Sequence, residues 1–593
     1  MQPERDFSEK PFLADRSLIK KLIAYLKRFP ALLTASLILL IISDLINASY
    51  PLFLKNGIDN NITAGDLPGL YKTTLFLALT LLAGFLFSTT FQILTNYLGQ
   101  KVIFAIRTDV LTKITQLTNR YFDKTPTGRN LTYLTNDIEA VKEFISSGII
   151  SIIGDMLKCL FILAFMIAIN WRLTLFALVG SLPIFIIATY LFRLKIRKGY
   201  RGVRTANSIM NTLLIESLTG IKEILLFNHR KKSITDFNSA SSNYLKSFLN
   251  IIHAYSIYFP LIEIVTSGSM IGILFFAHYT LNDLVTIGEL FTFFIYVNLF
   301  FRPLLHLAEQ FNSMQAATAA CERIFSFLAT KVEFTSTVPY TPQKRFTGAI
   351  AFNNVSFHYE KNNPVLKNIS FTIKPGQKVA IVGSTGSGKT TLISLLNRLY
   401  DVSAGSITID NTDIRNYHLT HLRENIGTIP QNIFLFTGSF HENIALFRDI
   451  PRAAIKKAAA HALIDTVIEK NPSSYDQNVL EEGKALSTGQ KQLLAFARIF
   501  IQNTPIVILD EATANIDSES ERHIEQALDS LLTDKTAIII AHRLATIARA
   551  DKIIVLHHGR IIASGSHEHL LRSSPIYQKL YSLQQIQLTT SSS

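Results

Sequence analysis

The stretch KVAIVGSTGSGKTTLISLLNRLY, Lys378 to Tyr400, decides the fold of the second half of the chain. It contains a β-branched strand, a glycine-rich loop and an amphipathic helix in that order, which is the context that the pattern G-x-x-x-x-G-K-[ST] requires. In such a loop, backbone N–H groups curl around phosphate oxygens. The stretch therefore predicts an α/β domain that binds a nucleotide.

The spacing within this loop assigns a role to each residue type. Lys389 is placed to reach the β- and γ-phosphates of ATP, and the Thr390 hydroxyl is placed to ligate Mg²⁺. The predicted ATP-binding residues of the loop are Gly383, Ser384, Thr385, Gly386, Ser387, Gly388, Lys389, Thr390 and Thr391.

Two later apolar strands end in polar residues. PIVILDEATANID, residues 505–517, places Asp510 to hold the metal and Glu511 to polarise the attacking water. TAIIIAHR, residues 536–543, places His542 near the γ-phosphate, although a lone histidine there is more often structural than catalytic.

A further anion site is predicted in KALSTGQKQLLAFARIF, Lys484 to Phe500. The pattern indicates a helix that is capped by Ser487 and has no acidic residue in its first turn. The unpaired N–H groups of such a helix start and its dipole both favour an anion. One chain would then carry two phosphate sites.

The composition of the whole chain indicates a protein that is partly embedded in a membrane. Hydrophobic residues make up 48% of the 593 residues, charged residues only 17%, and the mean hydropathy is +0.26. The net charge of +14 lies mainly in the apolar first half, which disfavours nucleic-acid binding by the second half. The two cysteines are too few for a disulfide framework, and the N-terminus lacks the apolar core of a secretory signal.

The first half contains six segments with the length and hydropathy of membrane-spanning helices. They lie near Pro30–Leu54, Thr73–Leu98, Phe144–Asn170, Leu173–Phe192, Leu249–Tyr279 and Ile287–Leu307. Seven Lys and Arg residues lie in 101–143 and eleven in 193–246, whereas the other connections carry two, one and none. This bias places both termini in the cytoplasm. The two basic connections are periodic, so membrane helices should continue into the cytoplasm.

The predicted organisation has an interfacial helix before the first span, with Leu18, Leu22 and Leu26 on one face. Asp44 and Glu263 within the spans are candidates to attract a cationic substrate; ion pairs such as Asp155 with Lys158 are the plainer interpretation of such groups. The predicted domains are 1–29 (N-terminal cytoplasmic segment), 30–330 (transmembrane), 331–347 (linker), 348–583 (ATPase) and 584–593 (polar tail).

These motifs together resemble an ABC transporter half-molecule of the exporter type, over nearly the whole length. LSTGQ, Leu486 to Gln490, resembles the LSGGQ signature of that family, and NVLEEGKA loosely resembles an exporter stretch before it. The family's fold implies an all-α six-helix transmembrane domain followed by an α/β P-loop ATPase domain. The resemblance also implies the roles of Tyr359 (adenine stacking), Gln431 (metal and water contact), His542 (switch) and Asp517 (communication between sites).

In this family two ATPase domains meet head to tail, so the signature of one chain serves ATP that its partner holds. Ser487, Thr488, Gly489 and Gln490 would contact the partner's nucleotide, and the Mg²⁺ ligands would be Thr390, Gln431 and Asp510. YFDKTPTGRNLTYLTNDIEAV (121–141) and ESLTGIKEILLF (216–227) resemble the cytoplasmic loops that dock on the ATPase near Gln431, the second on the partner's ATPase.

Thr488 stands where the family pattern has glycine, and a β-branched side chain crowds an anion site. This favours a heterodimer. In it, this chain supplies the hydrolytic residues of the competent site, and its altered signature completes the partner's degenerate site. A homodimer that tolerates threonine is the alternative.

The resemblance implies ATP-driven export or outward flipping of hydrophobic or amphipathic compounds, such as drugs, across the bacterial inner membrane. A homodimeric flippase for lipid A-like lipids or phospholipids is the alternative. Six spans disfavour a non-transport ABC ATPase, the fusion of the two domains disfavours an importer, and an ATP-gated channel has the same architecture.

Overall fold

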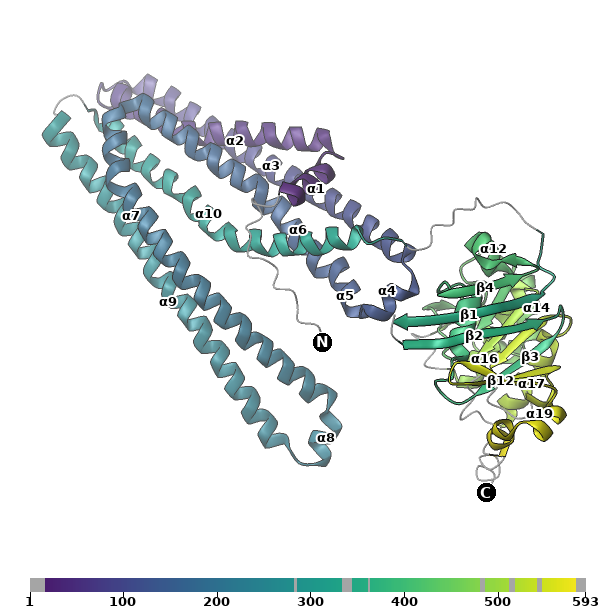
Figure 1. Ribbon diagram of the computed structural model, residues 1–593. Coiled ribbons are helices and arrows are strands. Elements are labelled where there is room, and N and C mark those ends of the chain that lie inside the picture. Colours follow the sequence, from purple (N-terminus) through teal and green to yellow (C-terminus); the bar gives the residue numbers. More distant parts are fainter. Residues whose placement is uncertain are drawn as a thin grey trace. The chain divides into compact units, whose positions relative to one another are not determined.

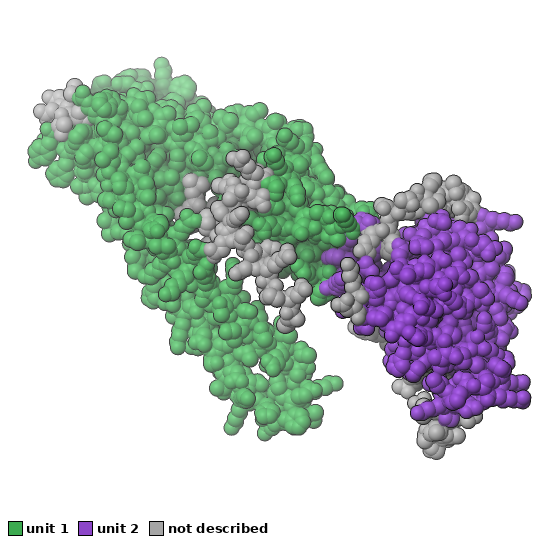
Figure 2. Space-filling model, viewed as in Figure 1, with its two compact units in different colours: residues 1–116, 125–331 green, residues 117–124, 332–593 purple. Residues whose placement is uncertain are grey.

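The computed structural model describes residues 16–281, 285–332, 344–360, 363–479, 486–510, 518–540 and 547–582. The chain divides into two compact units, and Figure 2 shows them in different colours. Unit 1 comprises residues 1–116 and 125–331, and unit 2 comprises residues 117–124 and 332–593.

Unit 1 is built from helices, most of them long and apolar (Figure 1). Its α-helices are α1 (Arg16–Leu26), α2 (Pro30–Asn56), α3 (Leu67–Gln116), α5 (Thr127–Thr132), α6 (Ile138–Glu143), α7 (Ile150–Thr219), α8 (Ile221–Leu226), α9 (Arg230–Phe276) and α10 (Ile287–Leu328). Short π-helical segments lie at Gly57–Ile62, Tyr133–Asp137, Phe144–Ile149 and Ala277–Leu281.

Within the described residues, five helical stretches have the length and composition to cross a membrane: Pro30–Ile62, Leu67–Gln116, Thr127–Thr219, Arg230–Tyr279 and Ile287–His306. The difference from the predicted six lies in α7, where Asn170 has non-helical angles (φ −157°, ψ 102°). Its Oδ1 accepts hydrogen bonds from the backbone N–H groups of Arg172 and Leu173, at 3.1 and 3.3 Å, and so starts a new helix. The stretch Thr127–Thr219 therefore contains two helices that meet at Asn170, where the third predicted span ends and the fourth is about to begin.

The second part of α7 and the whole of α9 lie side by side and are joined through α8 (Figure 1). At about 1.5 Å per residue, the 47 residues of α9 reach about 70 Å, more than twice the hydrocarbon thickness of a bilayer. These helices therefore extend well beyond a membrane, as the periodic basic connections predict.

Helix α1 packs its apolar face against protein. Leu18, Leu22, Tyr25 and Leu26 are buried, and the Tyr25 hydroxyl donates to Asp109 of α3 at 2.7 Å. The Tyr25 ring also stacks on Phe325 of α10, with 6.1 Å between centroids. The face of α1 that carries these leucines thus packs against α3 and α10.

Three acidic residues inside the spans lie in three different settings. Asp155 of α7 faces His306 of α10, with 3.9 Å between Oδ1 and Nδ1. Asp44 of α2 is buried and its Oδ2 has no hydrogen-bond partner among the described residues, whereas Glu263 of α9 is exposed. Asp44 and Glu263 therefore do not share one environment.

Unit 2 contains a mainly parallel sheet and a smaller antiparallel sheet. In the described residues the larger sheet has the order β12-β11-β3-β10-β9-β6, with β12 antiparallel, and the smaller has the order β2-β1-β4-β5. The strands are β1 (Ile350–Glu360), β2 (Asn363–Ile373), β3 (Lys378–Gly383), β4 (Ala404–Ile409), β5 (Thr412–Asp413), β6 (Ile426–Ile429), β7 (Gly438–Ser439), β8 (Asn478–Val479), β9 (Ile506–Asp510), β10 (Thr536–Ile540), β11 (Lys552–His557) and β12 (Arg560–Gly565).

Two apolar cores lie on the two faces of the larger sheet, because successive strand residues point to opposite faces. Val379 and Ile381 of β3 join the core under the antiparallel sheet, whereas Ala380 and Val382 join the core under the helices. The helices of unit 2 are α4 (Asn119–Lys124), α11 (Lys389–Leu396), α12 (Leu419–Asn425), α13 (Phe440–Ala445), α14 (Arg452–His461), α15 (Asp465–Glu469), α16 (Thr488–Gln502), α17 (Ser518–Leu531) and α19 (His567–Ser573). Short 3₁₀ turns lie at Ile414–Asn416 and Ser474–Asp476.

Candidate functional site

The candidate site lies at the carboxyl edge of the parallel sheet, where ligands bind in open α/β folds. Strand β10 pairs with β3 and β9, and Ile540 lies opposite both Ile381 and Asp510. Strand β6 runs parallel to β9, so Gln431, two residues after β6, emerges at the same edge. The fold thus brings the phosphate loop, Asp510 and Gln431 to one edge.

Lys389 begins α11 and folds back over the phosphate loop. Its Nζ donates to the carbonyl oxygens of Gly383 at 2.7 Å and Ser384 at 3.0 Å. Burial lowers the pKa of Lys389, and the negative charge of Asp510 opposes that shift. The ammonium is therefore largely withdrawn from water and lies in the field of Asp510, where a phosphate would add a further counter-charge.

The loop needs its glycines for two different reasons. Gly386 and Gly388 have positive φ angles of 79° and 104°, which other L-residues rarely adopt. A Cβ on Gly383 would lie 2.2 Å from the Leu556 carbonyl oxygen. The loop also leaves the Ser387 hydroxyl buried with no hydrogen-bond partner among the described residues. A loop with open backbone and an unsatisfied hydroxyl fits a phosphate group.

Tyr359 near the end of β1 presents a partly exposed ring beside this loop. Its hydroxyl lies 3.1 Å from the hydroxyl of Thr391 in α11, and its relative exposure is 39%. An exposed aromatic face tied to the phosphate-loop helix suits stacking on a purine.

The predicted cap of the second anion site is present at the start of α16. The Ser487 hydroxyl accepts from the Gln490 N–H at 3.2 Å, and the Gln490 side chain accepts from the Ser487 N–H at 3.1 Å. Thr488 is exposed in the first turn, whereas Gly489 is buried. The first turn thus presents Ser487 and Thr488 to solvent.

Arg498 on the same helix joins this second site to the segment after Gln431. Its guanidinium donates to the Phe434 carbonyl at 2.9 Å, the Asn443 carbonyl at 2.8 Å and the Asn443 Oδ1 at 3.1 Å. Burial lowers the pKa of Arg498 to about 10, so the side chain stays charged at neutral pH. Three hydrogen bonds therefore connect the residues that follow Gln431 to α16.

Comparisons with known proteins identify the family. The model of the ABC transporter transmembrane region matches residues 33–304, and the ABC transporter model matches residues 366–514. A putative ABC transporter ATP-binding protein of Streptococcus pneumoniae is 33% identical over 96% of this chain and 97% of its own length. The chain belongs to the ABC transporter family. It is a membrane transporter that hydrolyses ATP.

Other relatives of this ABC transporter carry more specific names. A putative multidrug export ATP-binding/permease protein of Bacillus subtilis is 31% identical over 96% of this chain and 100% of its own length. An ATP-dependent lipid A-core flippase of Haemophilus ducreyi is 32% identical over 96% and 99%. A bacterial Atm1-family ABC exporter, solved with ATP bound, is 25% identical, with a TM-score of 0.76 over 94% of this chain and 98% of that one. The predicted fold class, a helical transmembrane-type domain followed by an ABC ATPase, is confirmed.

The structure describes most, but not all, of the predicted site residues in this ABC transporter. Tyr359, the phosphate loop, Gln431, residues 487–490 and Asp510 are described. Glu511, Asp517 and His542, together with residues 480–485 of the exporter-like stretch, lie outside the described residues. The sequence reasoning did not identify Arg498 or Tyr400, since an arginine in an amphipathic helix and an aromatic residue after a helix carry no motif.

Proposed function

We propose that this ABC transporter exports hydrophobic or amphipathic compounds, such as drugs, from the cytoplasmic side to the outer side of a bacterial inner membrane. It works as one half of a dimer, with both termini and the ATPase unit in the cytoplasm. The observation that supports this proposal is that one ATPase unit has two helix starts suited to a phosphate group, one at α11 and one at α16. Ser487 and Thr488 at the capped start of α16 are exposed, so in this proposal they receive a nucleotide held by a second chain.

ATP binds at the phosphate loop in this proposal, with Lys389 turning from the carbonyls of Gly383 and Ser384 to the β- and γ-phosphates. Oxygen ligands suit Mg²⁺, and Thr390, Asp510 and Gln431 supply them at the carboxyl edge of the sheet. Glu511 directly follows β9 and acts as the general base for the attacking water. His542, two residues after β10, stabilises the γ-phosphate, and Asp517 communicates between the two sites.

Transport follows from the different contacts that the dimer makes before and after hydrolysis. ATP joins the phosphate loop of one chain to the first turn of α16 in the other, which closes the cytoplasmic side. Loss of the γ-phosphate removes that link, and the units separate. The exposed residues at the far end of the α7–α9 pair, among them Leu225, Leu226 and Phe227, contact the partner's ATPase unit and carry this motion to the membrane helices.

A heterodimer is the proposed assembly. Thr488 replaces the glycine of the family pattern in the first turn of α16, where it is exposed to a partner's nucleotide. A homodimer needs the same threonine at both sites. If the unsubstituted chain, purified alone, turns over ATP as fast as the two-chain complex, the heterodimer proposal fails.

A lipid flippase is the second candidate, because lipid A-core flippases are among the relatives that span this chain. The two candidates differ in what stimulates turnover. The test is reconstitution of the full chain into lipid vesicles, with and without candidate partner chains, followed by ATP turnover against cationic drugs and labelled lipids. Stimulation by drugs supports export of amphipathic compounds, and stimulation by lipids alone supports the flippase.

Glu511→Gln is the control for the chemistry. It should reduce turnover by about 10²-fold or more, as expected for loss of a general base, while ATP still binds. Turnover equal to that of the unsubstituted chain would remove Glu511 from its assigned role.

A further inference from the structure

Segment 117–124, which contains α4, folds with the ATPase unit although its neighbours in sequence belong to the helical unit (Figure 2). It follows α3 directly and precedes α5. The contacts of this segment therefore show which part of the ATPase the first cytoplasmic loop touches.

The central contact joins Asp123 of α4 to Tyr400 of the ATPase. The buried Tyr400 hydroxyl donates to the Asp123 carboxylate. Burial raises the pKa of Tyr400, and the hydrogen bond to Asp123 raises it further. The phenol therefore stays protonated and remains a donor at neutral pH.

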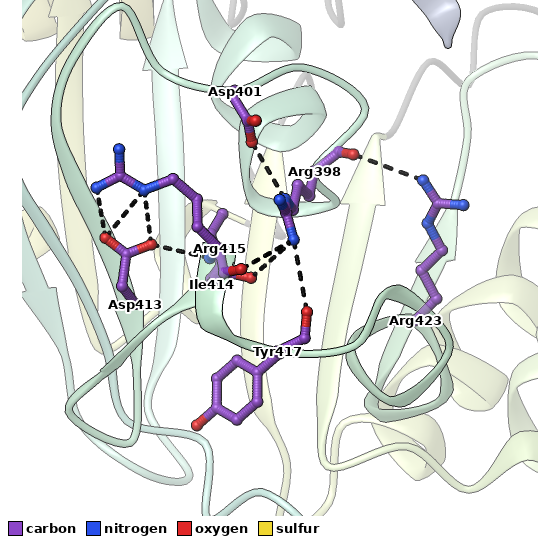
Figure 3. Close-up of polar contacts among 7 residues, drawn as sticks. All are labelled: Arg398, Asp401, Asp413, Ile414, Arg415, Tyr417 and Arg423. Carbon is purple, nitrogen blue, oxygen red and sulfur yellow. Dashed lines mark hydrogen bonds and ion pairs between the residues drawn. The ribbon is translucent and has the colours of Figure 1, made fainter. Parts of the chain in front are cut away.

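The residues on either side of Tyr400 are anchored, and Figure 3 shows the contacts of two of them, Arg398 and Asp401. Arg398 has a left-handed φ of 49° and is 7% exposed, and its Nε donates to Asp401 at 3.1 Å. The Arg398 carbonyl accepts from Arg423 at 3.5 Å. The Nη1 nitrogen of Arg398 donates, at 3.3–3.5 Å, to the carbonyls of Ile414, Arg415 and Tyr417. The turn that presents Tyr400 is thus fixed on both sides.

The same ring supports Tyr359, the proposed adenine-stacking residue. Tyr359 meets Tyr400 edge to face, with 5.3 Å between centroids and 89° between planes, and meets Phe357 at 4.9 Å and 86°. Aromatic pairs favour this geometry. Asp123, Tyr400 and Tyr359 thus form a continuous series of contacts from α4 to the nucleotide site.

A cavity of about 360 Å³ lies between these elements, within the roughly 300–1,000 Å³ of small-ligand pockets. Arg120, Asp123 and Lys124 of the 117–124 segment line one part, and Tyr359, Glu360 and Tyr400 line the rest. Tyr359 therefore lines the same cavity as three residues of the 117–124 segment.

We propose that α4 is one wall of the adenine pocket, so that the first cytoplasmic loop of the membrane half binds the base of ATP directly. Tyr359 stacks on one face of the purine, Arg120 packs its planar guanidinium against the base from the side of α4, and Tyr400 with Asp123 holds the wall in position. The proposal rests on the proposed nucleotide site at Tyr359. It places the contact of this loop at the base end of the nucleotide, in addition to any contact near Gln431.

The test is photolabelling of the full chain in native membranes with 8-azido-ATP, followed by mapping of the labelled peptides. Labels are expected in two places, the peptide that contains Tyr359 and the peptide that contains residues 117–124. If Tyr359 is labelled and residues 117–124 are not, the proposal is wrong. If Tyr359 is not labelled either, the proposed nucleotide site itself is wrong.

Two tyrosine variants test the positioning role. Tyr400→Phe removes a hydrogen bond to a charged group, so labelling of 117–124 and the apparent affinity for ATP should each fall about tenfold. Tyr417→Phe is the matched control, because its buried hydroxyl donates to the Ile409 carbonyl at 3.0 Å and does not line the cavity. The assigned role of Tyr400 is overturned if the two variants lose label and affinity equally.

Discussion

Replacement of Arg498 by methionine tests how firmly α16 is joined to the segment after Gln431. Methionine keeps much of the length and apolar volume of the arginine stem but removes all three hydrogen bonds. The affected acceptors are the Phe434 carbonyl and both oxygens of Asn443.

The cost follows from which acceptors can find another partner. Phe434 is exposed, so water replaces the guanidinium at its carbonyl at little cost. The Asn443 Oδ1 keeps its bond from the Phe436 N–H at 2.9 Å. The Asn443 carbonyl belongs to a residue that is 0% exposed, and an unsatisfied buried acceptor costs about 1–3 kcal/mol. We therefore expect the ATPase unit to lose about 2 kcal/mol, or about 4–8 °C in Tm for a unit of this size.

Calorimetry of the full chain in detergent measures this change as a shift of the ATPase transition. Arg452→Met is the control, since Arg452 is 50% exposed in a surface ion pair with Asp476, and such pairs contribute about 0–1 kcal/mol. The shift for Arg498→Met should not vary between pH 6 and 8, because the arginine is charged in the folded and unfolded states below its pKa of about 10. Equal Tm values for the two variants would refute the reasoning.

Three further substitutions have defined outcomes. Gly388→Ala forces a φ of 104° on alanine and places its Cβ 2.6 Å from Leu366, so ATP binding should fall below detection by equilibrium dialysis while the membrane unit still inserts. Asp137→Asn breaks the buried pair with Arg323 (N–O 2.5 and 3.0 Å) and should cost about 3–5 kcal/mol, seen as faster proteolysis of unit 1. Ser487→Ala removes the cap of α16, costs about 1 kcal/mol and should lower turnover without changing equilibrium ATP binding to this chain's own loop.

The sequence predicts the secondary structure of the ATPase unit well because its signals are local. The run KVAIVG ends at the glycine loop, and the structure has β3 ending at Gly383 and α11 beginning at Lys389. The boundary between the third and fourth spans is also predicted from hydropathy, which ends one span at Asn170 and begins the next at Leu173. The backbone of α7 breaks at Asn170.

The parts of the site that the sequence does not reveal depend on contacts between distant residues. The bond between Tyr400 and Asp123 joins residues 277 positions apart. The left-handed conformation of Arg398 is unusual for arginine and is stabilised by carbonyls of residues 414–417. Local propensity gives no indication of either feature, whereas a phosphate loop is specified by glycines and a lysine within one short stretch.

The two ends of ATP have different consequences in the proposed cycle. ATP and ADP share the adenine ring, so a contact between α4 and the base is the same before and after hydrolysis. A contact with no difference in free energy between two states does not shift the balance between them. The γ-phosphate is present in only one of the states, so the driving contact lies at the exposed first turn of α16 and at Lys389. In this proposal, the wall formed by α4 keeps the membrane loop attached while ATP becomes ADP, and separation of the dimer pulls on the helices through a contact that hydrolysis leaves intact.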